Sequence, residues 1–585
     1  MRRRRFPLFI NTTAGAVFIF CWIALLGLSR TLSARTDGND RQKVWIYLDT
    51  ERLKTEDFVP FTCSPRTAAR LLRKGIPGAK NFSATVPGEH IRAAIERCCR
   101  EILFYSRALQ AYSVYVDSTQ ILSLLNLPYI KELQAVRRYH RTSPPAPRRQ
   151  LEKSQVVNPL YGNSYAQLQR LNVPAVHELG FTGAGVRIAV IDAGFYKDHE
   201  AFQHIVADGR LVAERDFIFK DNDVQDDQTG SKTISAQCRH GTSVWSLIGG
   251  YVANTYIGAA YNAEFLLAKT EILASETPLE EDYFVAAVEW ADQSGADIIS
   301  SSVAYRYDFD NPANDHPYED LDGRTTPVAR AVNWAFERGI LPVICAGNAA
   351  QLFSDGGLMS PSDAFGALTI GAVNLDGQIA GFSSHGPTPD GRIKPDLCAP
   401  GVNIFVASSG SPTSYNSGDG TSYATPLIAG SAALLMEKYP TLTPAQIIEI
   451  LKSSASRSSN PDQSYGWGVP DIYHAMFAGD SLLIPGRPLA RKRLYALPNP
   501  AISDVALTFL WTHAIPTEKK VPLNIYNLLG ELIWSTELKP KIAGTQESIY
   551  WNLKNLQGQK VSSGIYIVTI NDRDTIIRGN CLVLH

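Results

Sequence analysis

The central part of this 585-residue chain alternates between apolar runs and amphipathic stretches. Residues 186–192 form a β-branched run, which is typical of a strand buried on both faces of a parallel sheet. The segments that follow predict strands at 264–269, 297–302, 341–346 and 368–373 and helices at 280–294 and 328–338. This alternation predicts a mostly parallel α/β sheet with helices on both faces.

The flanking regions follow other patterns. Residues 43–140 predict a compact α/β module, with strands at 44–48 and 113–116, a largely helical stretch at 90–109, a helix that Ser118 caps and that runs to 125, and a closing segment at 129–136. Beyond residue 497 the apolar positions alternate with a period of two. They predict strands at 505–511, 521–527, 531–536, 547–553, 564–571 and 575–584, and therefore a small β-sandwich over 498–585.

Proline-rich and charged segments separate these regions. Four arginines precede an apolar run at 14–28, which predicts an export signal over 1–34, with a retained membrane anchor as the alternative. Residues 141–160 contain the segment SPPAPRR, which is either an exposed cleavage region or a plain spacer. Residues 481–497 form a second linker, so that the central domain spans 161–480.

Composition narrows the class of protein. A length of 585 residues suggests about three or four domains, and 45% hydrophobic with 19% charged residues describes a folded protein. A net charge of −1 argues against nucleic acid as a partner. The eight cysteines show neither a disulfide framework nor a zinc pattern. Cys63 could bridge to Cys98 or Cys99, whereas Cys345 and Cys398 are expected to be buried thiols.

Three residues of catalytic type lie far apart in the chain. Ser422 follows a glycine-rich turn and precedes an apolar run at 427–436, so that a helix would aim its N–H groups at an oxygen near the hydroxyl. Asp192 ends the first strand of the sheet, and His240 opens a small apolar helix. Taken singly, each has an ordinary structural alternative: a helix cap, a turn aspartate or a structural histidine.

Four motifs occur in one order: Asp-Ala-Gly at 192–194, His-Gly-Thr at 240–242, Ala-Gly-Asn at 346–348 and Gly-Thr-Ser-Tyr-Ala-Thr-Pro at 420–426. Over residues 161–478 the chain resembles the subtilisin-like serine peptidases, the S8 family. The resemblance implies a subtilisin-like α/β fold and hydrolysis of peptide bonds in protein or peptide substrates.

The resemblance also implies the roles of individual residues. Ser422 would be the nucleophile, His240 its base and Asp192 the residue that orients the histidine, so activity would rise through roughly pH 6–7. Asn348 would donate to the oxyanion. The walls of the substrate pocket would come from two segments, namely Ser302, Val303 and Ala304, and Ala346 and Gly347.

Some positions depart from the family pattern. Ala193, Tyr423 and the pair at 349–350 replace residues that are common there, which leaves the catalytic groups intact but puts specificity and rate in question. No cofactor is indicated with certainty by the sequence. The acidic loop at 221–227 could bind a structural calcium ion, although a solvated charge run is the simpler interpretation.

The remaining regions fit an exported zymogen. The module at 43–140 resembles the propeptides of these peptidases, which predicts that the mature protein begins between Pro144 and Tyr161. Short sequence motifs in the last 90 residues, such as Leu-Pro-Asn-Pro at 497–500, resemble those of C-terminal sorting domains of type IX secretion. The alternative is an accessory β-sandwich without a sorting role. We therefore expect a secreted or cell-surface serine endopeptidase whose partners are its substrates, its own propeptide and the secretion machinery. The alternative is an inactive subtilisin-like binding or scaffold protein.

Overall fold

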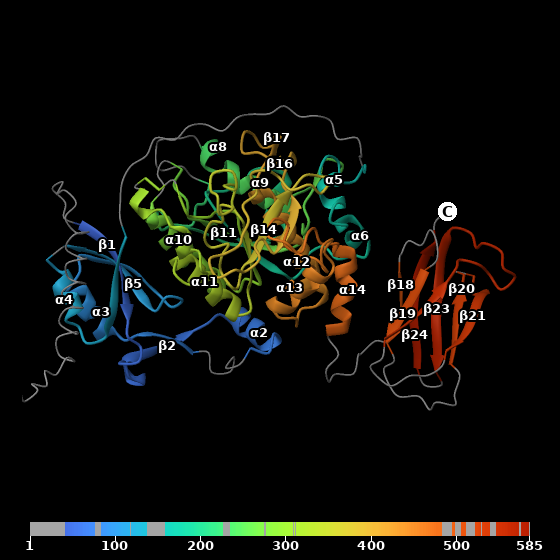
Figure 1. Ribbon diagram of the computed structural model, residues 1–585, viewed down its shortest axis with the longest axis horizontal. Helices are drawn as coiled ribbons and strands as arrows, with labels where there is room; N and C mark the ends of the chain where they lie inside the picture. Colours follow the sequence, from blue (N-terminus) through green and yellow to red (C-terminus); the bar gives the residue numbers. More distant parts are fainter. Residues whose placement is uncertain are drawn as a thin grey trace, which may run out of the picture. The chain divides into compact units, whose positions relative to one another are not determined.

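The computed structural model describes residues 41–76, 83–117, 119–136, 158–225, 234–273, 277–307, 309–310, 312–482, 494–497, 505–510, 521–527, 529–538, 546–572 and 575–583. The chain separates into two compact units, with the division between Gly479 and Asp480 (Figure 1). Within the described ranges, no helix combines the length and the apolar character that crossing a membrane requires.

The first unit begins with an antiparallel sheet in the order β4-β5-β1-β6. Its elements are β1 (Arg41–Leu48), α3 (Glu89–Glu96), β4 (Glu101–Ser106), β5 (Ala111–Asp117), α4 (Ile121–Leu125) and β6 (Ile130–Val136). The helix predicted over 90–109 was half wrong, since α3 ends at Glu96 and β4 follows. Ile102 pairs with Val114 of β5, and this cross-strand pairing holds the apolar and aromatic residues of β4 as a strand. Ser118 lies outside the described residues.

Both faces of β1 are covered. Val44 and Ile46 pack inside the module against α3, whereas Trp45 and Tyr47 join the core of the central α/β region. Alternate residues of a strand point to opposite faces, so the continuous apolar run at 44–48 reflects burial on both sides. The helices that receive the second face are α10 (Pro278–Gln293) and α11 (Pro327–Glu337), which lie beside the blue strands in Figure 1.

An arm extends from this module between β1 and α3. It contains η1 (Thr55–Asp57), β2 (Phe58–Thr62), α2 (Pro65–Arg73) and β3 (Ser83–Pro87), with β2 and β3 paired antiparallel. The apolar pattern gave no prediction for this segment. Ser64 caps α2 by accepting from the backbone N–H of Thr67, and Pro65 stands at the first helical position.

A seven-stranded parallel sheet forms the centre of the unit, in the order β15-β14-β13-β12-β7-β11-β8. The strands are β7 (Arg187–Asp192), β8 (Leu211–Asp216), β11 (Glu264–Lys269), β12 (Ile298–Ser301), β13 (Leu341–Cys345), β14 (Leu368–Val373) and β15 (Leu397–Pro400). The predicted parallel α/β architecture is confirmed. The edge strands β8 and β15 were missed.

Helices cover both faces of this sheet. On one face α10 and α11 pack against Ala189 and Ile191 of β7, and on the other lie α9 (Arg239–Gly249) and α12 (Thr421–Lys438). The smaller elements are α5 (Tyr165–Gln169), α6 (Val173–Glu178), η2 (Glu200–Phe202), α7 (Gln203–Ala207), α8 (Ile234–Gln237), β9 (Tyr251–Val252), β10 (Tyr256–Ile257), η3 (Pro312–Asn314), η4 (Tyr318–Asp320), β16 (Ile404–Ala407), β17 (Tyr415–Gly418), α13 (Pro444–Ser453) and α14 (Ile472–Leu482).

The second unit is a β-sandwich of two antiparallel sheets, β18-β19-β22 and β21-β20-β23-β24. Its strands are β18 (Leu494–Leu497), β19 (Val505–Leu510), β20 (Val521–Tyr526), β21 (Leu532–Leu538), β22 (Gln546–Trp551), β23 (Gly564–Asp572) and β24 (Thr575–Val583). Trp551 of β22 and Leu523 of β20 belong to one core, so the two sheets pack face to face. All strands expected from the period-two pattern are present, and β18 lies inside the expected linker.

The cysteines of the described residues are all free thiols. The bridge considered between Cys63 and Cys98 or Cys99 is therefore absent from this structure. Cys345 and Cys398 are buried thiols as expected.

Candidate active site

Asp192 lies at the carboxyl end of β7, where the connections of the sheet change direction. The chain passes from β7 to β8 and β11 on one side and then crosses to β12 on the other. Such a switch point is where open parallel sheets place their binding sites. The Asp192 side chain is fully buried, and its Oδ1 accepts from the backbone N–H of Ala193 at 2.8 Å.

His240 meets Asp192 from the second position of α9. Its Nδ1 lies 2.9 Å from both carboxylate oxygens. Gly241 permits this approach, because a Cβ there would lie 2.2 Å from the carbonyl oxygen of Gly194 and 3.2 Å from Asp192 Cβ. With Nδ1 turned to the carboxylate, Nε2 is the ring nitrogen left for a substrate or a nucleophile.

The pKa of His240 reflects two opposed effects. Burial lowers the pKa, while the charge and the hydrogen bond of Asp192, with a smaller contribution from the charge of Glu271, raise it. The net result is a pKa above the ordinary histidine value. The site therefore stabilises the imidazolium form of His240. A general base needs this stabilisation, because it holds a proton during the reaction.

Ser422 is the second residue of α12, and its hydroxyl donates to the carbonyl of Ser302 at 3.3 Å. In return, the Ser302 hydroxyl donates to the carbonyl of Ser422 at 2.9 Å. That carbonyl is available because Pro426, four residues on, lacks the N–H that would close the helical hydrogen bond. The proline inside α12 thus couples the start of the helix to the end of β12.

The start of α12 also lies against the histidine. The ring of Tyr423 is 6.2 Å from the imidazole of His240, centroid to centroid. No hydrogen bond joins His240 to Ser422 among the described contacts, since the serine hydroxyl points to Ser302. A rotation about its Cα–Cβ bond would turn it toward Nε2, and such bonds are often long in the absence of substrate.

Asn348 follows β13 and is held by the residue before the serine. Its Oδ1 accepts from the backbone N–H of Thr421 at 2.9 Å and from the Thr421 hydroxyl at 3.1 Å. This fixes the amide so that its Nδ2 remains as the donor, and the side chain is exposed. Gly420 has a φ of +154°, which other residues rarely adopt, and a Cβ there would make only an ordinary contact with Asn348 Nδ2, at 3.5 Å, so the backbone conformation and not the space calls for glycine.

The sequence of this chain is similar to those of proteins of known activity. A model of the subtilase family, peptidase family S8, matches residues 183–468. The serine protease AprX of Bacillus subtilis is 30% identical over 338 residues, which cover 52% of this chain and 67% of that protein. Subtilisin of Bacillus pumilus is 30% identical over 309 residues, covering 53% of this chain and 97% of the subtilisin.

The chain belongs to the subtilase family. It is therefore a serine-type endopeptidase of the subtilisin-like class. A solved structure of MycP1 from the ESX-1 type VII secretion system is also similar, with a TM-score of 0.42 and 23% identity over 55% of this chain and 88% of that one. A second family model, the secretion system C-terminal sorting domain, matches residues 495–582. A sorting domain on a subtilase indicates a secreted or cell-surface protein.

The two expected pocket walls lie at the carboxyl ends of neighbouring strands of this subtilase. Ser302, Val303 and Ala304 follow β12, and Ala346 and Gly347 follow β13. Val303 and Ala304 are half-buried, and the other three are buried. Gly347 has a φ of +104°, and a Cβ there would lie 2.8 Å from the Sδ of Met359. Met359 therefore backs this wall, which the sequence motifs did not indicate.

Glu271 is a titratable group near the active-site pair that no motif singled out. It follows β11, and its Oε1 accepts from the hydroxyls of Thr270 and Tyr305, each at 2.7 Å. Burial raises its pKa to about 7, and the charge of Asp192 adds to this, while hydrogen bonds and His240 act in the opposite direction. In the sequence, the only feature that could have indicated Glu271 was its position just after a buried strand, at the carboxyl edge of the sheet.

The acidic loop considered for calcium is partly described. Asp221 and Asp223 each accept from a backbone N–H two residues on, at 3.0 Å, as turn aspartates do. Asp226 and Asp227 lie outside the described residues. In the part of the subtilase that is described, no group of three or more His, Cys, Asp or Glu side chains could hold a metal ion.

Proposed function

We propose that this subtilase hydrolyses protein substrates through Ser422, His240 and Asp192, with an acyl-enzyme intermediate. The observation that carries the proposal is the pairing of Asp192 with His240 at 2.9 Å beside the start of α12. The Ser422 oxygen attacks the peptide carbonyl while Nε2 of His240 takes its proton. His240 then gives that proton to the leaving amine, and water repeats the sequence to release the acid.

Asn348 and the backbone N–H of Ser422 donate to the oxyanion of the tetrahedral intermediate. The bonds from Thr421 to Asn348 Oδ1 support this role, because they hold the amide in one orientation before substrate arrives. Preorganised donors of this kind need no rearrangement at the moment of reaction. The half-buried Val303 and Ala304, with Ala346 and Gly347 opposite, would contact the side chain next to the cut bond.

A fluorophosphonate probe tests the catalytic assignment. The probe reacts only with an activated serine, so the mature protein should label, and the Ser422→Ala and His240→Ala proteins should not. Ser431→Ala is a matched control, since that buried serine of α12 merely donates to the carbonyl of Leu427 at 2.7 Å. Labelling that persists in Ser422→Ala would refute the assignment and favour a different nucleophile. No labelling of the mature wild type would favour a scaffold protein.

We further propose that the protein is made as a zymogen whose N-terminal module is its propeptide. Trp45 and Tyr47 share a core with α10 and α11, which supports a module that folds onto the peptidase. Sequencing the N-terminus of secreted protein should give a start between Pro144 and Tyr161. A start near Arg35 would contradict the proposal.

Export would use the signal at 1–34 and the C-terminal sorting domain. The match to a secretion system sorting domain supports the type IX route for the second step. Deleting residues 495–585 should leave the protein inside the outer membrane while peptidase activity in lysates is kept. Normal secretion of the truncated chain would favour an accessory sandwich instead.

A further inference from the structure

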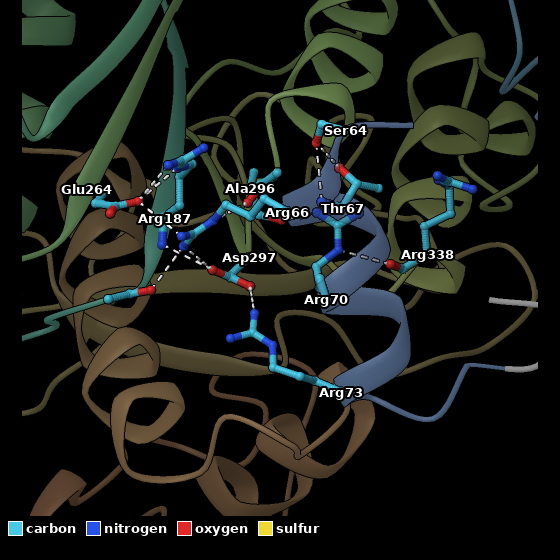
Figure 2. Close-up of polar contacts among 12 residues, drawn as sticks. Ser64, Arg66, Thr67, Arg70, Arg73, Arg187, Glu264, Ala296, Asp297 and Arg338 are labelled. Carbon is cyan, nitrogen blue, oxygen red and sulfur yellow. Dashed lines mark hydrogen bonds and ion pairs between the residues drawn. The ribbon is translucent and has the colours of Figure 1, made fainter. Parts of the chain in front are cut away.

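The arm of the N-terminal module contacts the peptidase at the edge of the sheet opposite to Asp192. Helix α2 lies across the carboxyl ends of α10 and α11, where each helix leads into a strand. Helix carboxyl ends present unpaired carbonyls and partial negative charge. The arm meets them with three arginines, at positions 66, 70 and 73 of α2 (Figure 2).

Arg70 is the central contact. Its guanidinium donates from Nε to the carbonyl of Arg338 at 3.3 Å, from one amino group to the carbonyl of Ala296, and from the other to Asp292. Both charged side chains of the Arg70–Asp292 pair are fully buried. The hydroxyl of Thr67 adds a bond to the backbone carbonyl of Asp292 at 2.5 Å.

Arg66 and Arg73 contact a second carboxylate from the same helix. Arg66 lies 3.1 Å from Asp297, and Arg73 lies 3.3 Å from the other oxygen of that carboxylate. Figure 2 shows both side chains reaching Asp297 from α2. Arg66 also donates to the carbonyl of Gly295 at 3.1 Å and pairs with Glu264 at 3.3 Å.

Two glycines leave the space that the arm fills. At Gly295, with φ +77°, a Cβ would lie 2.8 Å from the Cγ and Cδ of Arg66. At Gly339, with φ +79°, a Cβ would lie 2.6 Å from Ile76. Both follow the last turn of a helix, α10 and α11 respectively, where glycine is common. Here they also permit the close approach of the arm.

We propose that the arm is a second docking element, which keeps the N-terminal module bound to the peptidase after the linker between them is cut. The proposal rests on the zymogen proposal above, and extends it to the fate of the cleaved module. The sheet of the module binds α10 and α11 through apolar residues and through buried ion pairs such as Lys43–Asp282, and the arm binds the helix ends through its arginines. When one of these two contacts opens, the other still holds the module in place. The opened contact is therefore at a high effective concentration and forms again, so the module dissociates slowly.

The experiment uses the full chain with Ser422→Ala, so that no activity of its own is needed. A recognition site for a sequence-specific protease is placed between residues 144 and 149, the linker is cut, and the loss of the module from the immobilised peptidase is followed with time. We expect the module to stay bound. Arg70→Met, which keeps the apolar stem, should speed its release at least about 30-fold, as loss of one partner of a buried charge pair does.

Two matched controls separate docking from general effects of losing an arginine. Arg52 and Arg100 form ion pairs within the module, with Asp49 and Asp117, and their replacement by alanine should leave the release rate unchanged. If Arg70→Met does not fold, the double variant Arg66→Ala with Arg73→Ala serves, since these side chains are 28% and 41% exposed.

A module that leaves the wild type at once would overturn the proposal, as would release from the arginine variants at the rate of the Arg100→Ala control. Neither outcome bears on Ser422, because the probe experiment tests that residue separately. Conversely, a mature protein that does not react with the probe would leave the docking result intact.

Discussion

A buried aspartate lies at each of the two edges of the parallel sheet, but the basic side chains around the two aspartates differ. Asp192, at the carboxyl edge, meets one imidazole whose side chain is 35% exposed. Asp292, at the amino edge, lies among Arg70, Arg338 and Arg107, which are 0%, 5% and 6% exposed. At Asp192, one ring nitrogen of His240 remains available for chemistry. At Asp292, the guanidinium groups compensate the charge of the carboxylate completely.

This difference shows how a fold separates catalysis from binding. A catalytic carboxylate must stabilise a charge that appears and disappears on its partner, so the partner has to remain titratable and reachable. A docking carboxylate needs permanent charges, which guanidinium groups supply at every accessible pH. The same replacement, Asp→Asn, should therefore have opposite consequences at the two edges.

Asp192→Asn is expected to have the largest effect. Without the carboxylate, the tautomer of His240 that presents its unprotonated Nε2 to Ser422 is no longer favoured, and kcat should fall by about 10⁴-fold. The melting temperature should change little by comparison. Steady-state hydrolysis of a peptide substrate measures the first effect. Asp208→Asn, at an exposed ion pair with Arg210, is the control. A loss of less than tenfold would mean that Asp192 does not orient the base.

Asp292→Asn should behave in the reverse way. Three guanidinium groups would be left around a neutral amide, at a cost of about 3–5 kcal/mol in the stability of the full chain. Folded, matured protein should keep its kcat within about twofold. Chemical denaturation of the Ser422→Ala background measures the stability, again beside Asp208→Asn. A full chain that is as stable as its parent would show that the arginine cluster contributes no docking energy.

Asn348→Ala sharpens the comparison at the carboxyl edge. The variant removes one oxyanion donor but leaves the charge pair in place, so kcat should fall about 10²–10³-fold with little change in KM. Asn374→Ala is the matched control, since that amide only bonds Gln378 on an exposed turn at 3.0 Å. Equal losses in the two variants would exclude Asn348 from the oxyanion hole.

How far the sequence could predict these edges depends on the kind of signal. The central strands were found because burial on both faces makes them uniformly apolar, as at β7. The carboxyl edge was found through short motifs around Asp192, His240, Asn348 and Ser422. No such motif marks Glu271, whose importance arises only when β11 is placed beside β7.

The amino edge was beyond prediction for a different reason. Helix α2 has only nine residues and three arginines, so by itself it looks like a solvated surface helix. Arg70 becomes buried, and Arg66 and Arg73 gain carboxylate partners, because Asp292 and Asp297, more than 200 positions away, meet them. The helix expected at 90–109 failed similarly, since pairing with β5 decided the conformation of β4. Long-range pairing of this kind leaves no local pattern.

Glu271→Gln should have the smallest effect, and it concerns the pH at which the carboxyl edge becomes active. His240 must be neutral to take the proton of Ser422, and its pKa is raised, so activity should rise with pH through a value above 6.5. The Glu271 carboxylate contributes to that raised pKa through space. Glutamine retains an acceptor for the hydroxyls of Thr270 and Tyr305 but carries no charge.

Loss of this charge makes the imidazolium easier to deprotonate, so the acid limb of kcat/KM should move to lower pH. The shift should be less than about one unit, since a charge at this range contributes on the order of 1 kcal/mol. Because Glu271 itself has a pKa of about 7, the acid limb of the wild-type profile reflects the ionisation of both Glu271 and His240. The profile of the variant should show a single ionisation. A limb that stays in place, or moves to higher pH, would mean that Glu271 is not charged while His240 titrates.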